Sequence, residues 1–550
     1  MNALDNPFYY LSNFEQALAW LRLRYDDVLD AAEREFIEGF AHLPQGARAL
    51  LVRLVMRKGA HFRRGKLAYE EIGDASQAAA PLLSRGWLVA DAALSLADLF
   101  TLFGKAELRQ GFAEHALPAT ARKGEWFEAL APLHGRIAPL SEWWPGHEDA
   151  VWQLAVRPLC ERLRLLFFGN LRQDWSQFVV VELGIQRFES VDFAPHSRAF
   201  RHRQDLDVAL GLAECAQALE EGADTAVLLQ ALTALVSDNP WLASRRQKTL
   251  FRLAQRCERS GDWPQAANLY ADCRWPGARL RRLRMLERSE RFGEAMALAE
   301  QASQAPENAA EAQGLERLLP RLRRALGDKV RVRRASQAVV RLDLCLPPQR
   351  SVERAVCEAL NAEQAPVMYV ENTLFNALFG LLCWPALFAP VPGAFFHPFQ
   401  AAPLDLHQAD FAQRREAELA ACLAQLHSDA YRATILDRFA SKFGLANPFV
   451  HWGAVDEPLL RLALACIPAE HLRLCFERLL QDVKANRAGM PDLIQFFPAT
   501  AGYQMIEVKG PGDRLQDNQL RWIAFCQAHG LPVSVCHVRW QVPATSAQPA

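Results

Sequence analysis

The sequence predicts a multidomain protein that is mainly α-helical in its N-terminal and middle regions and ends in an α/β domain with a mixed central sheet. Three observations support this prediction. The chain has 550 residues, which is too long for one hydrophobic core. Apolar residues recur at helical spacing through the N-terminal and middle regions. Near the C-terminus, short strand patterns and helix patterns follow one another closely.

Residues 1–150 are expected to form an N-terminal helical region. The segments FEQALAWLRLRY and DDVLDAAEREFIEGFAHL are amphipathic, as helices that cover a core are. Within residues 97–131, two short helix patterns flank a loop that contains Pro118 and the polar stretch TARKG. This helix–loop–helix resembles a SAP motif, which is a small DNA-binding module. Any small helical hairpin would give the same pattern.

Basic residues crowd between Arg53 and Lys66, where they are interleaved with His61 and Phe62. Two interpretations fit this group: a solvated helix face, or a surface that contacts a nucleic-acid backbone. The net charge of the chain is −1, so any affinity for nucleic acid has to come from such local groups. The candidate DNA contacts are Arg53, Arg57, Lys58, Arg63, Arg64, Lys66, Lys123 and Arg487.

Residues 151–340 are expected to form a region of helical repeats. The stretch CERSGDWPQAANLYADC, from Cys257, aligns with LERSERFGEAMALAEQA, from Leu286, 29 residues later. This period and the repeated alanines are typical of stacked helix pairs and resemble a degenerate tetratricopeptide repeat. Earlier in the region, the run FVVVELG predicts one or two strands.

Residues 341–550 are expected to form the α/β domain. A strand over VVRLDLCLP and a helix over SVERAVCEALN mark its beginning, and a helix over ENTLFNALFGLLCW follows from Glu371. The last part of the chain alternates between strand and helix patterns. PDLIQFFP and GYQMIEVKG predict strands, NQLRWIAFCQAHG predicts a helix, and PVSVCHVRW predicts a final strand. This order is typical of an α/β unit with a mixed sheet.

Two carboxylates and a lysine are expected to meet at one edge of that sheet. Asp492 opens the first of the strands, and Glu507 and Lys509 lie in the next one. Residues two apart on a strand face the same side, and adjacent strands can bring Asp492 beside Glu507. Close carboxylates repel each other unless a cation lies between them, and hard oxygen ligands suit Mg²⁺ or Mn²⁺. An ordinary strand with an exposed ion pair has the same bare pattern.

Such a site fits the hydrolysis of a phosphodiester. A bound metal ion acidifies water and stabilises the charge of an in-line attack, while the lysine holds or deprotonates the nucleophile. Pro491-Asp492 with Glu507-Val508-Lys509 resembles the PD-(D/E)xK nucleases, and this resemblance makes the Val508 carbonyl a further metal ligand. The segments RAGMPD, EVKGPGDRL and QLRW together resemble the VRR-NUC branch of that superfamily.

The resemblance extends over nearly the whole chain. YVENTLFNALFGLLCW and LVRLVMRKGAHFRRGKLAYEEIG resemble segments of the Fanconi-associated nuclease family, in a member of bacterial type. The resemblance implies a structure-selective, metal-dependent DNA nuclease that cuts 5′ flaps, also acts as a 5′-to-3′ exonuclease and serves in interstrand crosslink repair. It also implies that a helix supplies Glu371 as a third catalytic and metal-binding carboxylate, and that Gln519 is an auxiliary residue. From the residues alone, Glu371 fits equally well as an acid favoured by a helix N-terminus, and Gln519 as a surface residue.

Two other functions fit the sequence. One is a Holliday-junction resolvase-like enzyme, because single VRR-NUC modules can resolve junctions as dimers. The other is a non-catalytic DNA-binding scaffold, against which the intact Asp492, Glu507 and Lys509 argue. The long region that precedes the nuclease-like module favours a monomer that grips branched DNA asymmetrically, and no protein partner can be named.

Several features indicate an intracellular protein. The 12 cysteines occur singly, without a CxxC pair, as expected for reduced thiols. The first residues lack the pattern of a signal peptide. The uncharged stretch 372–400 is interrupted by Pro385, Pro390 and Pro392, so we expect a buried helix and a loop instead of a membrane span. The expected location is the cytoplasm, in association with the nucleoid, for a bacterial protein, or the nucleus for a eukaryotic one.

Overall fold

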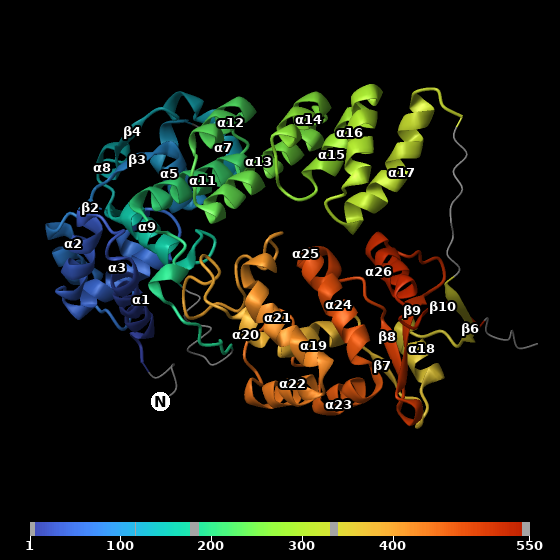
Figure 1. Cartoon of the computed structure of the whole chain (residues 1–550). Helices are drawn as coiled ribbons and strands as arrows, with labels where there is room; N and C mark the ends of the chain where they lie inside the picture. Colours follow the sequence, from blue (N-terminus) through green and yellow to red (C-terminus); the bar gives the residue numbers. More distant parts are fainter. Residues whose placement is uncertain (1–5, 116, 176–185, 330–338, 542–550) are drawn as a thin grey trace, which may run out of the picture. The chain divides into compact units, whose positions relative to one another are not determined.

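A computed structural model describes residues 6–115, 117–175, 186–329 and 339–541 (Figure 1). The chain divides into two compact units. The first comprises Met1–Gln186 with Phe200–Ala213, and the second comprises Arg187–Ala199 with Glu214–Ala550. Most of the expected repeat region therefore groups with the C-terminal domain, and the three ranges 1–150, 151–340 and 341–550 remain a prediction.

Helices build most of the first unit, as the amphipathic patterns predict. A capping box starts α2, because Asp30 accepts a hydrogen bond from the Glu33 amide at 2.8 Å and Glu33 accepts one from the Asp30 amide at 2.9 Å. The buried Glu33 also pairs with Arg162 at 2.6 Å and with Arg203 at 2.7 Å, which ties three helices together. The described helices outside the SAP-like region include α1 (Tyr9–Tyr25), α2 (Ala31–Ala41), α3 (Gln45–Met56), α4 (Ala75–Ser84) and α9 (Arg157–Phe168).

Short strands that the sequence patterns did not reveal complete this unit. A three-stranded antiparallel sheet has the order β1 (His61–Arg63), β5 (Val151–Leu154), β2 (Leu88–Ala90), and β3 (Ala93–Ser95) pairs with β4 (Ile137–Pro139). The SAP-like region has a core of its own around Trp126, Trp143 and Trp144. Its helices are α5 (Leu96–Leu102), α6 (Lys105–Gly111), α7 (Lys123–Ala129) and α8 (Leu140–Trp143).

The predicted repeat is visible in the helices of the second unit. Gly261 ends α13 with a φ of +85°, and Glu290 occupies the equivalent turn after α15 with a φ of +57°. The spacing of 29 residues therefore holds for backbone conformation as well as for sequence. The run FVVVELG lies outside the described residues. From α11, which begins in the first unit, the helices are α11 (Arg203–Glu220), α12 (Thr225–Ala234), α13 (Pro240–Ser260), α14 (Trp263–Ala271), α15 (Ala278–Arg288), α16 (Phe292–Gln304) and α17 (Ala309–Ala325).

A five-stranded mixed sheet forms the centre of the C-terminal domain, which confirms the predicted fold class. Strand β10 runs parallel to both of its neighbours, whereas β8 runs antiparallel to both of its own. The pairing of Leu493 with Ile506 brings Asp492 beside Glu507, as expected. The order of the strands is β6 (Val340–Leu346), β10 (Val533–Trp540), β9 (Gly502–Lys509), β8 (Leu493–Phe497) and β7 (Val367–Tyr369).

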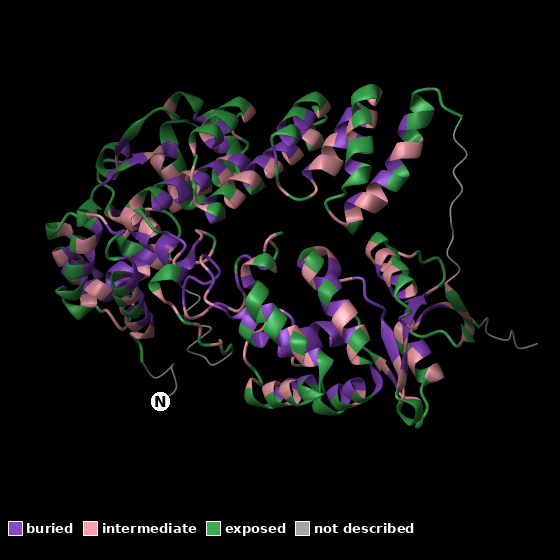
Figure 2. Cartoon of the chain, in the orientation of Figure 1, coloured by how far each residue is buried: buried purple, intermediate pink, exposed green. Residues whose placement is uncertain are grey.

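The two faces of the sheet pack against different helices. Helix α18 (Val352–Leu360) places Val356 against Ile506 and Val508 on one face. The other face carries Ile494 and Met505 into a larger core, which Figure 2 shows as a buried interior between strands and helices. Strand alternation puts Asp492, Glu507 and Lys509 on this second face. The helices around this core include α19 (Leu374–Leu382), α20 (Trp384–Leu387), α21 (Glu416–Ala424), α22 (Ala430–Ser441), α23 (Glu457–Cys466), α24 (Ala469–Gln481), α25 (Val483–Asn486) and α26 (Asp517–Ala528).

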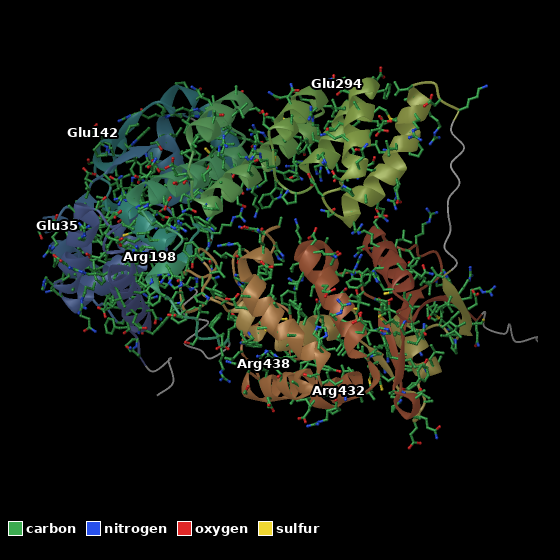
Figure 3. All side chains as sticks on the ribbon, in the orientation of Figure 1. Glu35, Glu142, Arg198, Glu294, Arg432 and Arg438 are labelled. Carbon is green, nitrogen blue, oxygen red and sulfur yellow. The ribbon has the colours of Figure 1, made fainter. Side chains whose placement is uncertain are left out.

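The uncharged stretch 372–400 forms a buried helix, a short second helix and a loop, as expected. Arg438 of α22, labelled in Figure 3, donates a hydrogen bond of 2.9 Å to the Leu381 carbonyl and a second bond to the Leu382 carbonyl. These bonds satisfy the C-terminus of α19. Within the described ranges, no helix has the length and apolar character needed to cross a membrane.

Candidate active site

The predicted residues of the site meet where β8 begins and β9 ends. Asp492 lies directly before β8, and its Oδ2 accepts a hydrogen bond of 2.8 Å from the Val508 amide. The Lys509 ammonium lies 2.7 Å from Oε1 of Glu507, so these two side chains share one side of the strand, as expected. All three side chains are buried, and Glu507 is 0% exposed. Their catalytic roles remain a prediction.

Burial and mutual repulsion make the carboxyl groups weak acids. Burial raises the pKa of Asp492 to about 6; the charge of Glu371 adds to this, while the Val508 amide and Lys509 oppose it. Burial raises the pKa of Glu507 to about 7; Asp492 and Glu371 add to this, and Lys509 opposes it. A cation bound between these groups would relieve the repulsion and restore their charge.

Glu371 does not come from a helix, contrary to the expectation from the family resemblance. It lies in a turn in which the Thr373 amide donates to the Val370 carbonyl at 2.9 Å, and α19 begins only at Leu374. Asn372, with a φ of +51°, interrupts helical geometry between Glu371 and α19. Glu371 is exposed, yet its charge acts on both buried carboxyl groups.

The donor set fits a hard divalent cation. Both Glu507 oxygens are buried without a hydrogen bond of acceptable geometry among the described residues, and only the close approach of Lys509 offsets their charge. A buried carboxylate in that condition suits Mg²⁺ or Mn²⁺. Among the residues that the structure describes, no group of three or more His, Cys, Asp or Glu side chains is close enough to hold a metal ion as it stands. The Val508 carbonyl remains a predicted further ligand.

Gln519 caps a helix. Its side-chain oxygen accepts a hydrogen bond of 2.8 Å from the Gln516 amide at the start of α26. The nearby Gly489 has a φ of +92°, and a Cβ atom there would lie 2.9 Å from the backbone of Asn518. Close packing against α26 therefore requires this glycine. The auxiliary role of Gln519 remains a prediction.

Several of the candidate DNA contacts have partners inside the protein. Arg53 bonds to Glu71 at 2.6 Å, and Arg63 lies between Glu107 at 2.7 Å and Asp149 at 2.9 Å. Acidic partners distant in the sequence thus neutralise these two arginines. Lys123 donates to the Phe103 carbonyl at 2.7 Å, Arg487 donates to the Pro448 carbonyl at 2.9 Å, and Arg64 donates to the Glu148 carbonyl at 3.3 Å.

The remaining basic candidates gather around one cavity. Arg57, Lys58 and Lys66 are exposed and line a cavity of about 320 Å³ in the first unit. The wall of the cavity includes His61 and one acidic residue, Asp98. In this basic cavity, three exposed cationic side chains of the predicted DNA-binding surface lie together.

Known proteins give independent information about the chain. Three family models match it: "FAN1, HTH domain" over residues 8–89, "Fanconi anemia-associated nuclease SAP domain" over residues 93–143 and "VRR-NUC domain" over residues 426–540. A Fanconi-associated nuclease 1 homolog of Pseudomonas aeruginosa is 54% identical over 543 residues, which cover 98% of this chain and 97% of the relative. The chain belongs to the Fanconi-associated nuclease family. The resemblance inferred from the motifs is therefore confirmed, and the chain is a nuclease.

Other members of the Fanconi-associated nuclease family are more distant. A homolog of Arabidopsis thaliana is 24% identical over 96% of this chain and 67% of the relative.

A crystal structure of paFAN1 bound to 2nt 5′flap DNA with gap matches this chain with a TM-score of 0.90 and 54% identity, over 98% of this chain and 99% of that one. The multidomain fold is thus confirmed, including the SAP region that contains residues 97–131.

Proposed function

We propose that this protein cuts the phosphodiester backbone of branched DNA that carries a 5′ flap. The observation that carries this proposal is the meeting of Asp492, Glu507 and Lys509 at the buried end of β8 and β9. The substrate class is supported by the crystal structures of paFAN1, which are bound to 5′flap DNA. A 5′-to-3′ exonuclease activity and a role in interstrand crosslink repair complete the proposal, for a monomer acting on chromosomal DNA in the nucleoid or nucleus.

The proposed cofactor is Mg²⁺ or Mn²⁺. Asp492, Glu507 and Glu371 would hold it, with the Val508 carbonyl as a further ligand. When bound, the cation acidifies water and neutralises charge that develops on the phosphate. The hydrogen bond from the Val508 amide fixes the orientation of Asp492, so this carboxylate is already in place before DNA arrives.

Lys509 is the proposed partner of the nucleophile. Its ammonium approaches Glu507 at 2.7 Å, and a cation on Glu507 would compete with that ion pair. Once released from Glu507, Nζ can orient the attacking water or donate to a phosphate oxygen. The same residue therefore stabilises the metal-free site and serves the reaction.

The basic cavity is proposed to hold the backbone of a duplex arm. Arg57, Lys58 and Lys66 are exposed on the same cavity, so their charges add in the field that attracts a phosphate. Contacts of this kind position DNA without reading its bases. Selection of a flap depends on shape, so a sequence-independent grip suits the proposed substrate.

Labelled 5′-flap, 3′-flap, four-way-junction and duplex DNA, each incubated with Mn²⁺, Mg²⁺ or EDTA, test the proposal. We expect metal-dependent incision mainly on the 5′ flap and none in EDTA. Preferential cleavage of the four-way junction would instead indicate a resolvase. Binding without cleavage under every condition would contradict the proposal and favour a scaffold.

A further inference from the structure

Two neighbouring side chains hold the Glu371 carboxylate from both sides. The Tyr369 hydroxyl donates a hydrogen bond to Oε2, and the Asn372 amide donates one to Oε1 at 3.2 Å. Tyr369 is the last residue of β7 and is 55% exposed, so it contributes little to the core. An exposed glutamate with a donor on each oxygen has far less freedom than an ordinary surface glutamate.

Asn372 also holds the segment that leads to Asp492. Its side-chain oxygen accepts hydrogen bonds from the Gly489 amide at 2.8 Å and from the Met490 amide at 3.2 Å. The Val370 amide donates to the Asp492 carbonyl at 2.9 Å, so the two segments are joined on either side of the turn. One amide side chain therefore connects Glu371 with the backbone two residues before Asp492.

The backbone at Asn372 is held in an uncommon conformation. Its φ of +51° is in the left-handed region, which Asn tolerates better than most residues. Asn376 holds the turn from α19, because its amide donates to the Asn372 carbonyl at 2.7 Å and to the Arg487 carbonyl at 2.9 Å. A glycine would adopt the positive φ of this turn at least as readily, so the turn by itself does not require the asparagine side chain.

We infer that Tyr369 and Asn372 are positioning residues that restrict Glu371 to the neighbourhood of Asp492 for metal binding. This inference rests on the proposed function, in which both carboxylates hold the cation. The backbone pairing between the two segments ends with the bond from Val370 to Asp492 and does not include Glu371, which is on an exposed turn. The Asn372 side chain supplies a second link beyond Glu371, and Tyr369 orients the carboxylate that it holds.

Mn²⁺ titration of the DNA-free protein by calorimetry tests the inference. Asn372→Gly keeps the left-handed turn and removes all three side-chain hydrogen bonds. We therefore expect Mn²⁺ to bind about 10- to 100-fold more weakly, as is typical when a group that orients a metal ligand is lost. Tyr369→Phe removes only one hydroxyl, and we expect a weakening of about 2- to 10-fold, as for the loss of one hydrogen bond. Ala501→Gly is the matched control, because Ala501 also has a positive φ, +48°, but lies after η8 (Pro498–Thr500), in the turn between β8 and β9. Its affinity for Mn²⁺ should be unchanged.

The dependence of incision on Mn²⁺ gives a second measurement. In Asn372→Gly the half-maximal Mn²⁺ concentration should rise by the same factor as the dissociation constant, and the rate at saturating Mn²⁺ should recover to near the wild-type value. A rate that stays low at saturating Mn²⁺ with unchanged affinity would overturn the inference. If Asn372→Gly does not fold, the same measurements on Tyr369→Phe test the inference. The Tyr369 side chain is exposed, so this substitution should leave folding intact.

Glu371→Ala in the same titration separates this inference from the proposed function. Weak binding in Glu371→Ala together with near-wild-type binding in both positioning variants would overturn the inference and leave the proposed metal ligands standing. Unchanged binding in Glu371→Ala would remove Glu371 from the metal site and overturn the inference with it. Weakening in all three variants, greatest in Glu371→Ala, is the result expected.

Discussion

In the metal-free protein, burial makes the charged form of Asp492 less favourable than the neutral form. Its pKa of about 6 in the folded protein exceeds the ordinary value of 3.8, so the folded state holds the proton more tightly than the unfolded state. Folding stability from this group is therefore lost as the pH rises from about 4 through about 6. Above that range the folded protein carries a buried, repelled carboxylate.

Asp492→Asn should therefore stabilise the metal-free protein at pH 8, because the amide oxygen can still accept from the Val508 amide and no charge is buried. We expect a gain of about 1–2 kcal/mol in the free energy of unfolding at pH 8 and almost none near pH 4. Urea denaturation in EDTA at the two pH values measures it. If Asp492→Asn were less stable than the wild type at pH 8, the buried charge of Asp492 would not destabilise the folded protein, contrary to this prediction.

The sequence was informative about the residues whose spacing follows strand geometry. Period-two alternation was enough to predict that Glu507 and Lys509 share a side, and the order of the strands put Asp492 beside them. The turn at Glu371 could not be predicted, because it depends on the positive φ of Asn372. The only signal for Asn372 was a polar residue close to an apolar run.

Long-range pairing explains why basic residues were harder to interpret. Arg63 is held by Glu107 and Asp149, which lie 44 and 86 residues away in the chain. No local pattern shows such partners, so the sequence could not separate Arg63 from the exposed Lys58 and Lys66. The structure separates them by burial and by contact.

At the scale of helices and strands, the 29-residue repeat has a structural counterpart in its turns. The Asp262 amide donates to the Cys257 carbonyl after α13, and the Arg291 amide donates to the Leu286 carbonyl after α15. Both are the long hydrogen bonds of a Schellman motif, which needs a residue with positive φ. One repeat supplies Gly261 there, and the other supplies Glu290.

Glu290→Gly should therefore stabilise the second unit. The left-handed conformation costs a residue with a side chain about 1–2 kcal/mol, partly offset by the larger backbone entropy of glycine in the unfolded chain. We expect a net gain of about 0.5–1 kcal/mol in thermal or urea unfolding. The reverse substitution, Gly261→Glu, should destabilise; a loss of stability in Glu290→Gly would contradict this account of the repeat.

Periodic elements were easier to predict than short ones. Helices such as α13 and α15 and the strands β8 and β9 follow clear helical or strand patterns, so the repeat and the mixed sheet were both expected. β1, β2, β3 and β4 have only three residues each, too few to show alternation. Their pairing depends on partners far along the chain, which a local pattern cannot reveal.

At the scale of the whole molecule, nucleic-acid binding has to come from local charge. The net charge is −1, so the exposed Arg57, Lys58 and Lys66 at the basic cavity are expected to supply part of the attraction. Each lost phosphate contact lowers the slope of log affinity against log salt by about 0.9.

Lys58→Gln with Lys66→Gln should weaken binding to a 5′ flap and reduce the salt slope by about 2. Fluorescence anisotropy over a salt series in Ca²⁺ or EDTA measures it. The matched control is Arg354→Gln with Arg461→Gln, which removes two exposed charges that each pair with a glutamate one turn away. An equal change of slope in both double variants would assign the effect to overall charge instead of the cavity.

If a metal-dependent site built on Asp492 cuts a 5′ flap, the loss of its carboxylate should abolish incision. The decisive experiment compares the wild-type protein with Asp492→Asn on one labelled 5′-flap substrate in Mn²⁺, with binding measured in parallel. We predict that the variant binds the flap with near-wild-type affinity, is no less stable to unfolding, and loses incision by at least about 10³-fold. Incision by Asp492→Asn at a rate near that of the wild type would show that the Asp492 carboxylate is not part of the site that cuts.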